Sequence, residues 1–297
     1  DIHKPNILSI LLMERTKKQL TALVEGGDFY EAQQLYKATH RRLMQRQKYE
    51  ETKALLDSGA KIMIKQKQYG QANELISLLL GVFEESPESA SLDLILGLFE
   101  LYPTDVNITG VLREAIKWSQ GYRTKKENIK KAHPSLLLTL ATRSWVGGNY
   151  GESLKAFLEA EAPDEFVDML SDWTSKAMPS ECDLICTRAV LLLLTKGNLK
   201  EANEVFDGFT KRFYAAKDSR TPLINFTQFL LLTLERDAYP FFQQLVEKYQ
   251  PSIQRDPSFS ANLERIAEVF FRVSQPKPNN FLGDMLKSFL GGGAGAQ

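Results

Sequence analysis

Two cysteines are the residues of this chain whose spacing first points to chemistry. Cys182 and Cys186 stand four residues apart, so on a helix they share one face and supply half of a metal site. A structural zinc site needs about four such ligands, and no other pair of cysteines or histidines has the spacing of a zinc finger. We therefore expect both to be buried structural thiols, and we predict no metal site.

Histidines and acidic pairs could serve acid–base chemistry, but their arrangement is unfavourable. His3, His40 and His133 lie far apart in the sequence. Two arginines follow His40 and disfavour its protonated form, whereas His133 precedes a proline and is expected to cap a helix. Neighbours such as Glu84 and Glu85 point in different directions on a helix. Because serine elbows, zincin helices and phosphate loops are also missing, the sequence predicts no catalytic residues and no cofactor.

The elements that carry these residues all have the pattern of helices. Apolar residues recur at spacings of three and four, as in Leu92, Ile95, Leu96 and Phe99, whereas alternation with period two is rare. Proline and glycine interrupt this pattern every few helical turns, at positions typical of helix starts and ends. The sequence therefore predicts an all-α chain of about fourteen helices joined by short turns.

A repeated motif indicates how the helices are arranged. A large apolar residue is followed by an acid or amide two positions later, and by a small residue three positions later. Positions 0, 3, 6 and 7 share one helix face, so the small residue is expected where a neighbouring helix comes close. Copies one helix plus one turn apart favour a right-handed α-solenoid of stacked helical hairpins, similar to tetratricopeptide repeats. The copies are Phe29-Tyr30-Glu31-Ala32, Tyr49-Glu50-Glu51-Thr52, Tyr69-Gly70-Gln71-Ala72, Tyr150-Gly151-Glu152-Ser153 and Leu199-Lys200-Glu201-Ala202.

Charge is balanced overall but arranged in blocks. The 297 residues carry 37 Lys plus Arg and 37 Asp plus Glu, which argues against nucleic-acid binding because phosphate contacts require an excess of cations. Basic blocks span 37–67 and 113–131, and acidic blocks span 81–105 and 152–183. Each block alone can be the solvated face of an amphipathic helix. Together the four blocks indicate separate basic and acidic docking faces.

The chain is predicted to form one solenoid over 1–275, with two less regular segments. Residues 214–222 contain turn formers without an apolar stripe and are predicted to form a long inter-helix loop. Residues 276–290 combine a linker with a short amphipathic helix, and 291–297 form a flexible tail. The short helix can cap the stack, bind a partner or lie on a membrane; with a single lysine as its cation, the membrane is the weakest of these.

Several motifs, in order along nearly the whole chain, resemble one known family. They are Gly27-Asp28-Phe29-Tyr30-Glu31-Ala32, Tyr49-Glu50, Ser58-Gly59-Ala60, Lys65-Gln66-Lys67-Gln68, Tyr249-Gln250-Pro251-Ser252, Arg255-Asp256-Pro257, Pro276-Lys277, Asn280-Phe281-Leu282 and Phe289-Leu290-Gly291. In these the chain resembles the Get-four family, the fourth factor of the guided entry of tail-anchored proteins. The resemblance implies a cytosolic helical-repeat adaptor without enzymatic activity.

The resemblance also implies two partners and the surfaces that bind them. The N-terminal half, 1–148, is expected to dock a dimeric ATPase that targets tail-anchored membrane proteins to the endoplasmic reticulum. The C-terminal half, 149–275, is expected to bind a ubiquitin-like co-adaptor, which brings a chaperone with its client. The expected ATPase-binding residues are Lys37, Arg41, Arg42, Arg46, Lys48 and Glu74. The expected co-adaptor-binding residues are Phe213, Tyr214, Leu223, Phe226 and Phe229.

Bridging of these partners is therefore the expected function, and the cytosol is the expected location. Two cysteines can form at most one disulfide bond, which is too few to stabilise a secreted chain of this length, and an apolar signal sequence is missing. The apolar runs are also too short for a bilayer span, so no membrane insertion is expected. The alternative is a scaffold subunit, built from helical repeats, of another large cytosolic complex. A hydrolase would need a cluster of converging polar residues that the sequence does not display.

Overall fold

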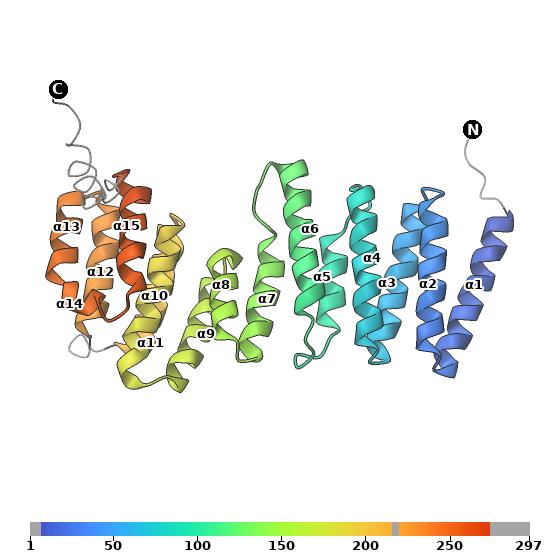
Figure 1. Cartoon of the computed structure of the whole chain (residues 1–297), viewed down its shortest axis with the longest axis horizontal. Coiled ribbons are helices and arrows are strands. Elements are labelled where there is room, and N and C mark those ends of the chain that lie inside the picture. Colours follow the sequence, from blue (N-terminus) through green and yellow to red (C-terminus); the bar gives the residue numbers. More distant parts are fainter. Residues whose placement is uncertain (1–6, 216–219, 274–297) are drawn as a thin grey trace, which may run out of the picture. The chain divides into compact units, whose positions relative to one another are not determined.

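The computed structural model describes residues 7–215 and 220–273, and within these ranges all regular secondary structure is helical (Figure 1). Contacts between the helices divide the chain into two compact units, Asp1–Glu161 and Ala162–Gln297. We call them the N-terminal and the C-terminal unit. The predicted all-α fold is confirmed. The predicted linker and short helix over 276–290, the tail 291–297 and His3 lie outside the described residues.

The helices of both units are listed here by their bounds. The N-terminal unit contains α1 (Ile7–Gly26), α2 (Phe29–Met44), α3 (Tyr49–Lys65), α4 (Tyr69–Glu85), α5 (Leu92–Glu100), α6 (Thr109–Glu127), α7 (Pro134–Val146) and α8 (Tyr150–Ala160). The C-terminal unit contains α9 (Pro163–Lys176), the 3-10 helix η1 (Pro179–Glu181), α10 (Cys182–Thr195), α11 (Leu199–Phe213), α12 (Pro222–Glu235), α13 (Tyr239–Lys248), α14 (Gln250–Ile253) and α15 (Ser258–Phe271).

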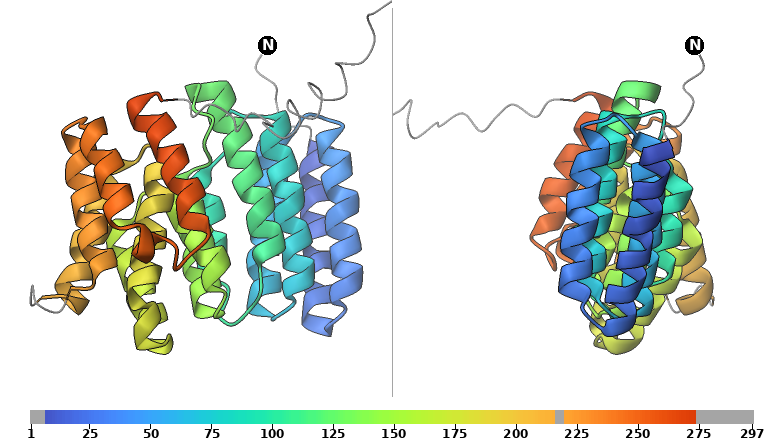
Figure 2. Two further views of the ribbon diagram at one scale, coloured as in Figure 1. Left: turned by 60° about the vertical axis from the view of Figure 1, so that its left-hand side comes forward. Right: turned by 90° about the vertical axis from the view of Figure 1, so that its right-hand side faces the viewer.

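Neighbouring helices pack in hairpins within each unit, as Figure 2 shows. In the N-terminal unit α2 packs on α3, α3 on α4, α4 on α6 and α7 on α8. In the C-terminal unit α11 packs on α9, α10 and α12, while α10 also contacts α15, and α12 contacts α13. Contacts between helices adjacent in the chain are typical of stacked repeats, so the predicted arrangement in helical hairpins is confirmed.

One type of turn joins helices at six places in the described chain. In each turn a residue with positive φ donates its amide N–H to the carbonyl three residues earlier, and the next residue donates to the carbonyl five residues earlier. After α3, for example, the Lys67 N–H lies 2.9 Å from the Ile64 oxygen, and the Gln68 N–H 2.8 Å from that of Met63. This is the Schellman motif, which satisfies the last carbonyls of a helix. The left-handed residues are Gly27, Gln47, Lys67, Gly148, Gly197 and Asp237.

The next helix begins two residues after each of these turns, and five of these starts carry the repeated motif. Its small residue has no exposed surface in any copy: Ala32, Thr52, Ala72, Ser153 and Ala202 are each 0% exposed. The prediction that this position faces a close neighbouring helix is therefore confirmed. A similar close approach occurs at Gly59 of α3, where an added Cβ would lie 2.7 Å from the ring of Tyr36 on α2.

The short helix α5 is held by a side chain from α7. The guanidinium of Arg143 donates to the backbone oxygens of Phe99 and Tyr102 at 2.8 and 2.9 Å, and to that of Pro103 at 3.0 Å. The last carbonyls of a helix have no partner within the helix. Arg143 supplies partners for those at the end of α5, and so connects two helices that are separated by α6 in the sequence.

Two ion pairs connect α10 to the segment before α15 in the C-terminal unit. The Asp183 carboxylate is almost fully buried and accepts two bonds from Arg255, at 2.7 and 3.0 Å. Arg188, five residues further along α10, donates to Asp256 at 2.7 and 3.1 Å. Arg255 binds both oxygens of Asp183 in the fork geometry in which arginine binds a carboxylate most strongly, whereas both bonds of Arg188 go to one oxygen of Asp256. They attach the α14–α15 turn to the middle of the unit.

The ends of α6 and α13 do not coincide with a proline or glycine break. α6 ends at Glu127, because Asn128 adopts a left-handed conformation (φ 55°). α13 and α14 divide at Tyr249, two residues before Pro251, which cannot donate a helical hydrogen bond. The described residues form fifteen α-helices, compared with the predicted number of about fourteen.

The left-handed conformation of Lys67 leads to a stability prediction. For a residue with a Cβ, this conformation costs about 1–2 kcal/mol of free energy, whereas for glycine the loss of chain entropy on folding costs roughly 0.5–1 kcal/mol. Lys67→Gly is therefore expected to raise the free energy of unfolding by about 1 kcal/mol, measured as a higher urea midpoint. Lys65→Gly, two residues earlier in the last turn of α3, is the matched control and is expected to lower it. A loss of stability in both variants would contradict the argument.

Candidate partner-binding surfaces

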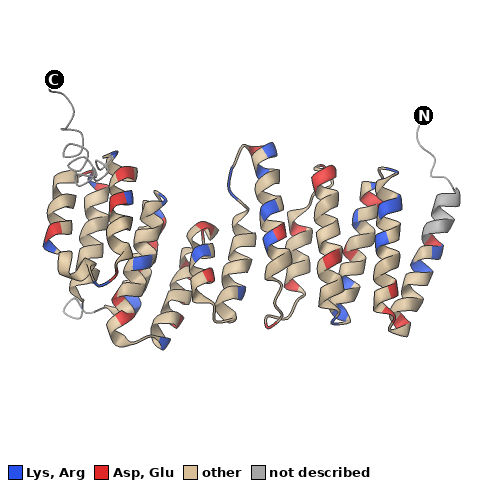
Figure 3. Ribbon diagram, in the orientation of Figure 1, with Lys and Arg blue, Asp and Glu red and all other residues tan. Residues whose placement is uncertain are grey.

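Three arginines at the end of α2 form the most accessible part of the expected ATPase surface. Arg41 and Arg46 are exposed, and Arg42 is half-buried. The only bond from these side chains is a weak one, from Arg42 to the hydroxyl oxygen of Thr39 at 3.3 Å, and none of the three has a carboxylate partner among the described residues. We call these residues the α2 arginine cluster. Figure 3 shows the blue bands on α2.

The other three residues expected on this surface are occupied by ion pairs. Lys37 on α2 pairs with Glu74 on α4, and Lys48, in the turn before α3, pairs with Glu51 at 2.6 Å. The Glu74 side chain is 52% exposed, so this pair lies at the surface. The structure thus brings Lys37, Glu74 and the α2 arginine cluster to neighbouring helices of one unit. Of the expected cations, Lys37 and Lys48 are paired with carboxylates, whereas those of the α2 arginine cluster are not.

His40 lies next to this cluster but is half-buried. Burial lowers the pKa of its imidazole; Glu85 opposes this effect, and Arg41 adds to it. The direction predicted from the neighbouring arginines is confirmed, although desolvation is the larger cause. His133 caps α7, since its Nδ1 accepts the Ser135 N–H at 3.3 Å, and burial followed by the Arg123 charge lowers its pKa as well.

The five residues expected to bind the co-adaptor divide into exposed and buried ones. Phe213, the last residue of α11, is 37% exposed, and Phe229 on α12 is 48% exposed. Leu223 and Phe226 are 0% exposed, and Tyr214 is buried as well. Burial also raises the pKa of Tyr214 to about 12. Leu223, Phe226 and Tyr214 are therefore core residues that offer no surface to a partner in this conformation, and they are removed from the candidate surface.

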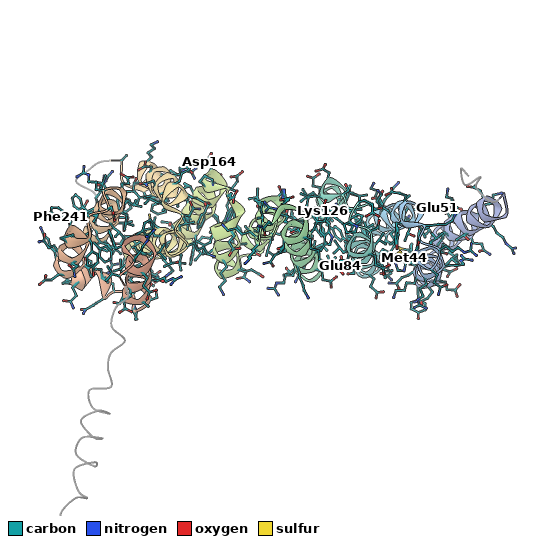
Figure 4. All side chains as sticks on the ribbon, turned by 90° about the horizontal axis from the view of Figure 1, so that it is seen from above. Met44, Glu51, Glu84, Lys126, Asp164 and Phe241 are labelled. Carbon is teal, nitrogen blue, oxygen red and sulfur yellow. The ribbon has the colours of Figure 1, made fainter. Side chains whose placement is uncertain are left out.

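Exposed apolar residues of the same unit that were not predicted include one on α12 and one on α13. Leu232 follows Phe229 by one helical turn on α12 and is 38% exposed, while Phe241 on α13 is 66% exposed. Figure 4 labels Phe241 at the outside of its helix. We call Phe213, Phe229 and Leu232 the α11–α12 apolar surface. The apolar residues of α12 lie on almost all sides of the helix, so a sequence pattern cannot separate its buried face from its exposed face.

The residues that first pointed to chemistry are arranged as structural residues. Cys182 and Cys186 are free thiols on α10; Cys186 is buried as expected, whereas Cys182 is only half-buried. Burial raises the pKa of both, so that they are protonated at neutral pH. Among the described residues no three His, Cys, Asp or Glu side chains come close enough to hold a metal ion. No described helix is both long and apolar enough to cross a membrane.

Comparison with known proteins shows the family of this chain. The family model described as Golgi to ER traffic protein 4 matches residues 46–290. The chain belongs to this family. The Golgi to ER traffic protein 4 homolog of Dictyostelium discoideum is 33% identical over 288 residues, covering 95% of this chain and 91% of the relative. The homolog of Homo sapiens is 32% identical over 290 residues, covering 94% and 87%.

A solved member of the Golgi to ER traffic protein 4 family has the same fold. The crystal structure of C. therm. Get4 matches this structure with a TM-score of 0.82 and 24% identity, covering 94% of this chain and 96% of the other. The resemblance inferred from ordered motifs is therefore confirmed, and so is the predicted α-solenoid fold. The family name connects these relatives with traffic between the Golgi and the endoplasmic reticulum.

The lowered pKa values of His40 and His133 predict a loss of stability in acid. Both imidazoles prefer the neutral form in the folded chain, while their unfolded pKa is about 6.5. The unfolded state therefore binds more protons below this pH, and stability decreases as the pH falls from about 7 to about 5.5. Urea unfolding across this range measures the effect.

The control for this prediction removes the titrating groups and keeps the helix cap. In the double variant His40→Gln and His133→Asn, the asparagine retains an acceptor for the α7 N-terminus. We expect the stability of this variant to change less with pH than that of the unchanged chain. An equal slope for both proteins would show that other groups cause the acid sensitivity.

Proposed function

We propose that this chain is a non-enzymatic cytosolic adaptor of the Golgi to ER traffic protein 4 family. It connects a ubiquitin-like co-adaptor, with its chaperone-bound client, to the dimeric ATPase that delivers tail-anchored proteins to the endoplasmic reticulum. The observation that carries this proposal is the α2 arginine cluster: three guanidinium groups without carboxylate partners among the described residues. Family membership supports the role in traffic, and the exposed charges support docking of an acidic protein surface.

Charge attraction is the main interaction proposed for the ATPase. Arg41 and Arg46 are exposed, so an acidic partner can reach them without displacing an internal partner. Such contacts accelerate encounter and fix the orientation of the complex more than they increase its affinity. The ATPase surface is therefore expected to bind rapidly and to be sensitive to salt.

We propose that Glu74 exchanges its ion-pair partner, Lys37, for a basic group of the ATPase on binding. Its ion pair with Lys37 is exposed, and such a pair contributes only about 0–1 kcal/mol. A basic group of the ATPase can therefore replace Lys37 at small cost, which leaves Lys37 free for an acidic group. In this proposal, Glu74 and Lys37 act together as one adjustable contact between α2, α4 and the ATPase.

Apolar burial is the interaction proposed for the co-adaptor. Phe229 and Leu232 lie one turn apart on α12, and Phe213 stacks on Phe209 of α11 with ring centroids 4.7 Å apart. A rigid aromatic at the surface is a favourable anchor for a partner helix, since little side-chain entropy is lost on binding. We therefore assign the α11–α12 apolar surface to the co-adaptor.

Binding the co-adaptor and the ATPase at the same time explains how the chain acts without catalysing a reaction. When both surfaces are occupied, the client-loaded chaperone is held near the ATPase, and transfer of the client becomes a reaction within one complex. The gain is an effective concentration, commonly in the range of about 1 mM for short flexible connections. No covalent bond is made or broken by the chain.

The α2 arginine cluster predicts a salt-dependent loss of ATPase binding. Arg41→Glu combined with Arg46→Glu replaces attraction by repulsion, and we expect the affinity to fall at least about tenfold at low salt and less at high salt. Biolayer interferometry with the ATPase at two ionic strengths measures this. Lys130→Glu with Lys131→Glu, two exposed cations of the same unit, is the control with an equal change of charge. Equal losses in both variants would reject a specific surface.

The α11–α12 apolar surface predicts a loss of co-adaptor binding without unfolding. Phe229→Asp places a carboxylate in the proposed interface, and we expect co-purification of the co-adaptor to fall at least about tenfold while the melting temperature changes little. Met178→Asp is the control, because Met178 is exposed in the same unit but lies outside α11 and α12. Undiminished co-purification with Phe229→Asp would place the co-adaptor elsewhere.

A further inference from the structure

A second basic surface lies around a cavity that the proposed function does not use. The cavity lies between the end of α4 and the second half of α6, and its volume is about 380 Å³. Its lining combines aromatic side chains with three lysines and one acid. The aromatic residues of the lining are Phe83, Trp118 and Tyr122, and its lysines are Lys117, Lys125 and Lys126.

The aromatic residues form a connected and mostly rigid wall. The ring centroids of Phe83 and Trp118 lie 5.5 Å apart, and those of Trp118 and Tyr122 lie 5.8 Å apart. Phe83 and Trp118 are 1% and 5% exposed, so packing fixes both rings, while Tyr122 is half-buried. Aromatic residues held in this way are typical anchors of binding sites.

Trp118 also has a hydrogen-bond donor without a partner. Its indole Nε1 is buried and forms no hydrogen bond with the described residues. A buried indole N–H normally finds an acceptor, since leaving it unpaired costs free energy. An oxygen of a molecule that enters this cavity is one group that can supply the missing acceptor.

The three lysines at the cavity are exposed and form no ion pair with a described residue. Lys117, Lys125 and Lys126 have no carboxylate within ion-pair distance among the described residues, although the charge of Lys126 acts on Glu88. Lys130 and Lys131 of the same unit are also exposed and without an ion pair to a described residue, so these three lysines differ from them in lining an aromatic cavity. Figure 3 shows blue bands along α6 and on the segment after it, and Figure 4 labels Lys126 and Glu84 on the two helices that border the cavity.

We propose that this cavity binds an acidic peptide segment that carries one large apolar side chain. The volume is large enough for an aromatic or leucine side chain together with neighbouring peptide atoms. The aromatic wall provides its contact surface, and the lysines pair with acidic residues on either side of it. A membrane surface fits less well, because a recessed aromatic cavity adds nothing to binding of a flat layer of head groups. We call the site the α4–α6 peptide site.

A displayed library of random nine-residue peptides, selected on the immobilised chain, tests this proposal. We expect enrichment of peptides that combine Trp, Phe or Leu with at least two neighbouring acids. The triple variant Lys117→Glu, Lys125→Glu and Lys126→Glu is expected to lose this enrichment at least about tenfold. The control variant Lys18→Glu, Lys200→Glu and Lys248→Glu, which has the same change of charge on exposed residues, is expected to retain it.

A second measurement separates a defined site from a general attraction of charges. The most enriched peptide is labelled with fluorescein, and its affinity is measured by fluorescence polarisation for Tyr122→Ala and Tyr122→Phe. We expect a loss of about tenfold for alanine and little change for phenylalanine, which keeps the ring. Circular dichroism confirms that each variant is folded.

Three results would overturn the proposal. The first is an enriched set without the combination of acids and an apolar residue, or no enrichment at all. The second is equal enrichment on the triple variant. The third is sedimentation of the chain with vesicles of phosphatidylserine and phosphatidylcholine that depends on the same three lysines, which would assign them to a membrane surface instead.

Discussion

The fold of this chain depends on one backbone constraint, the left-handed residue that ends a helix and reverses the chain. At six turns of the described chain the same two hydrogen bonds satisfy the last carbonyls of one helix, and the next helix begins two residues later. Because the geometry is local, each hairpin is specified by a few residues close together in the sequence. The small buried residue one turn into the following helix then allows the two helices to approach.

This local origin explains why the hairpins could be predicted and some boundaries could not. The repeated motif marks helix starts directly, and glycine marks three of the six turns. Gln47 and Lys67 adopt the same conformation without any signal of their own, since neither residue type favours it. Asn128 does favour it, but it lies in a polar, basic stretch where no apolar pattern marks the end of α6. Helix existence was therefore predictable, whereas helix ends depended on the backbone conformation of single residues.

The candidate surfaces were predictable only in part, because exposure and pairing are properties of the folded chain. Lys37 and Glu74 are far apart in sequence, and nothing local indicates that they form an ion pair. Likewise α12 is apolar on nearly every side, so that Phe226 and Phe229, three residues apart, differ from 0% to 48% in exposure. The α4–α6 peptide site combines residues from two helices, and only the basic block of α6 was visible in the sequence. Charge blocks thus located surfaces, while packing decided which of their members are available.

The two ion pairs of α10 also restrict how α15, the last described helix, can be aligned. Asp183 pairs with Arg255, and Arg188 pairs with Asp256. If the segment before α15 slid along α10 by one helical turn, about 5.4 Å, both pairs would break and the buried Asp183 carboxylate would lose its cation. A buried charge without a partner is strongly destabilising. The two pairs therefore disfavour a shifted register, and the alignment of α15 depends on the arrangements that they penalise as well as on the bonds that they form.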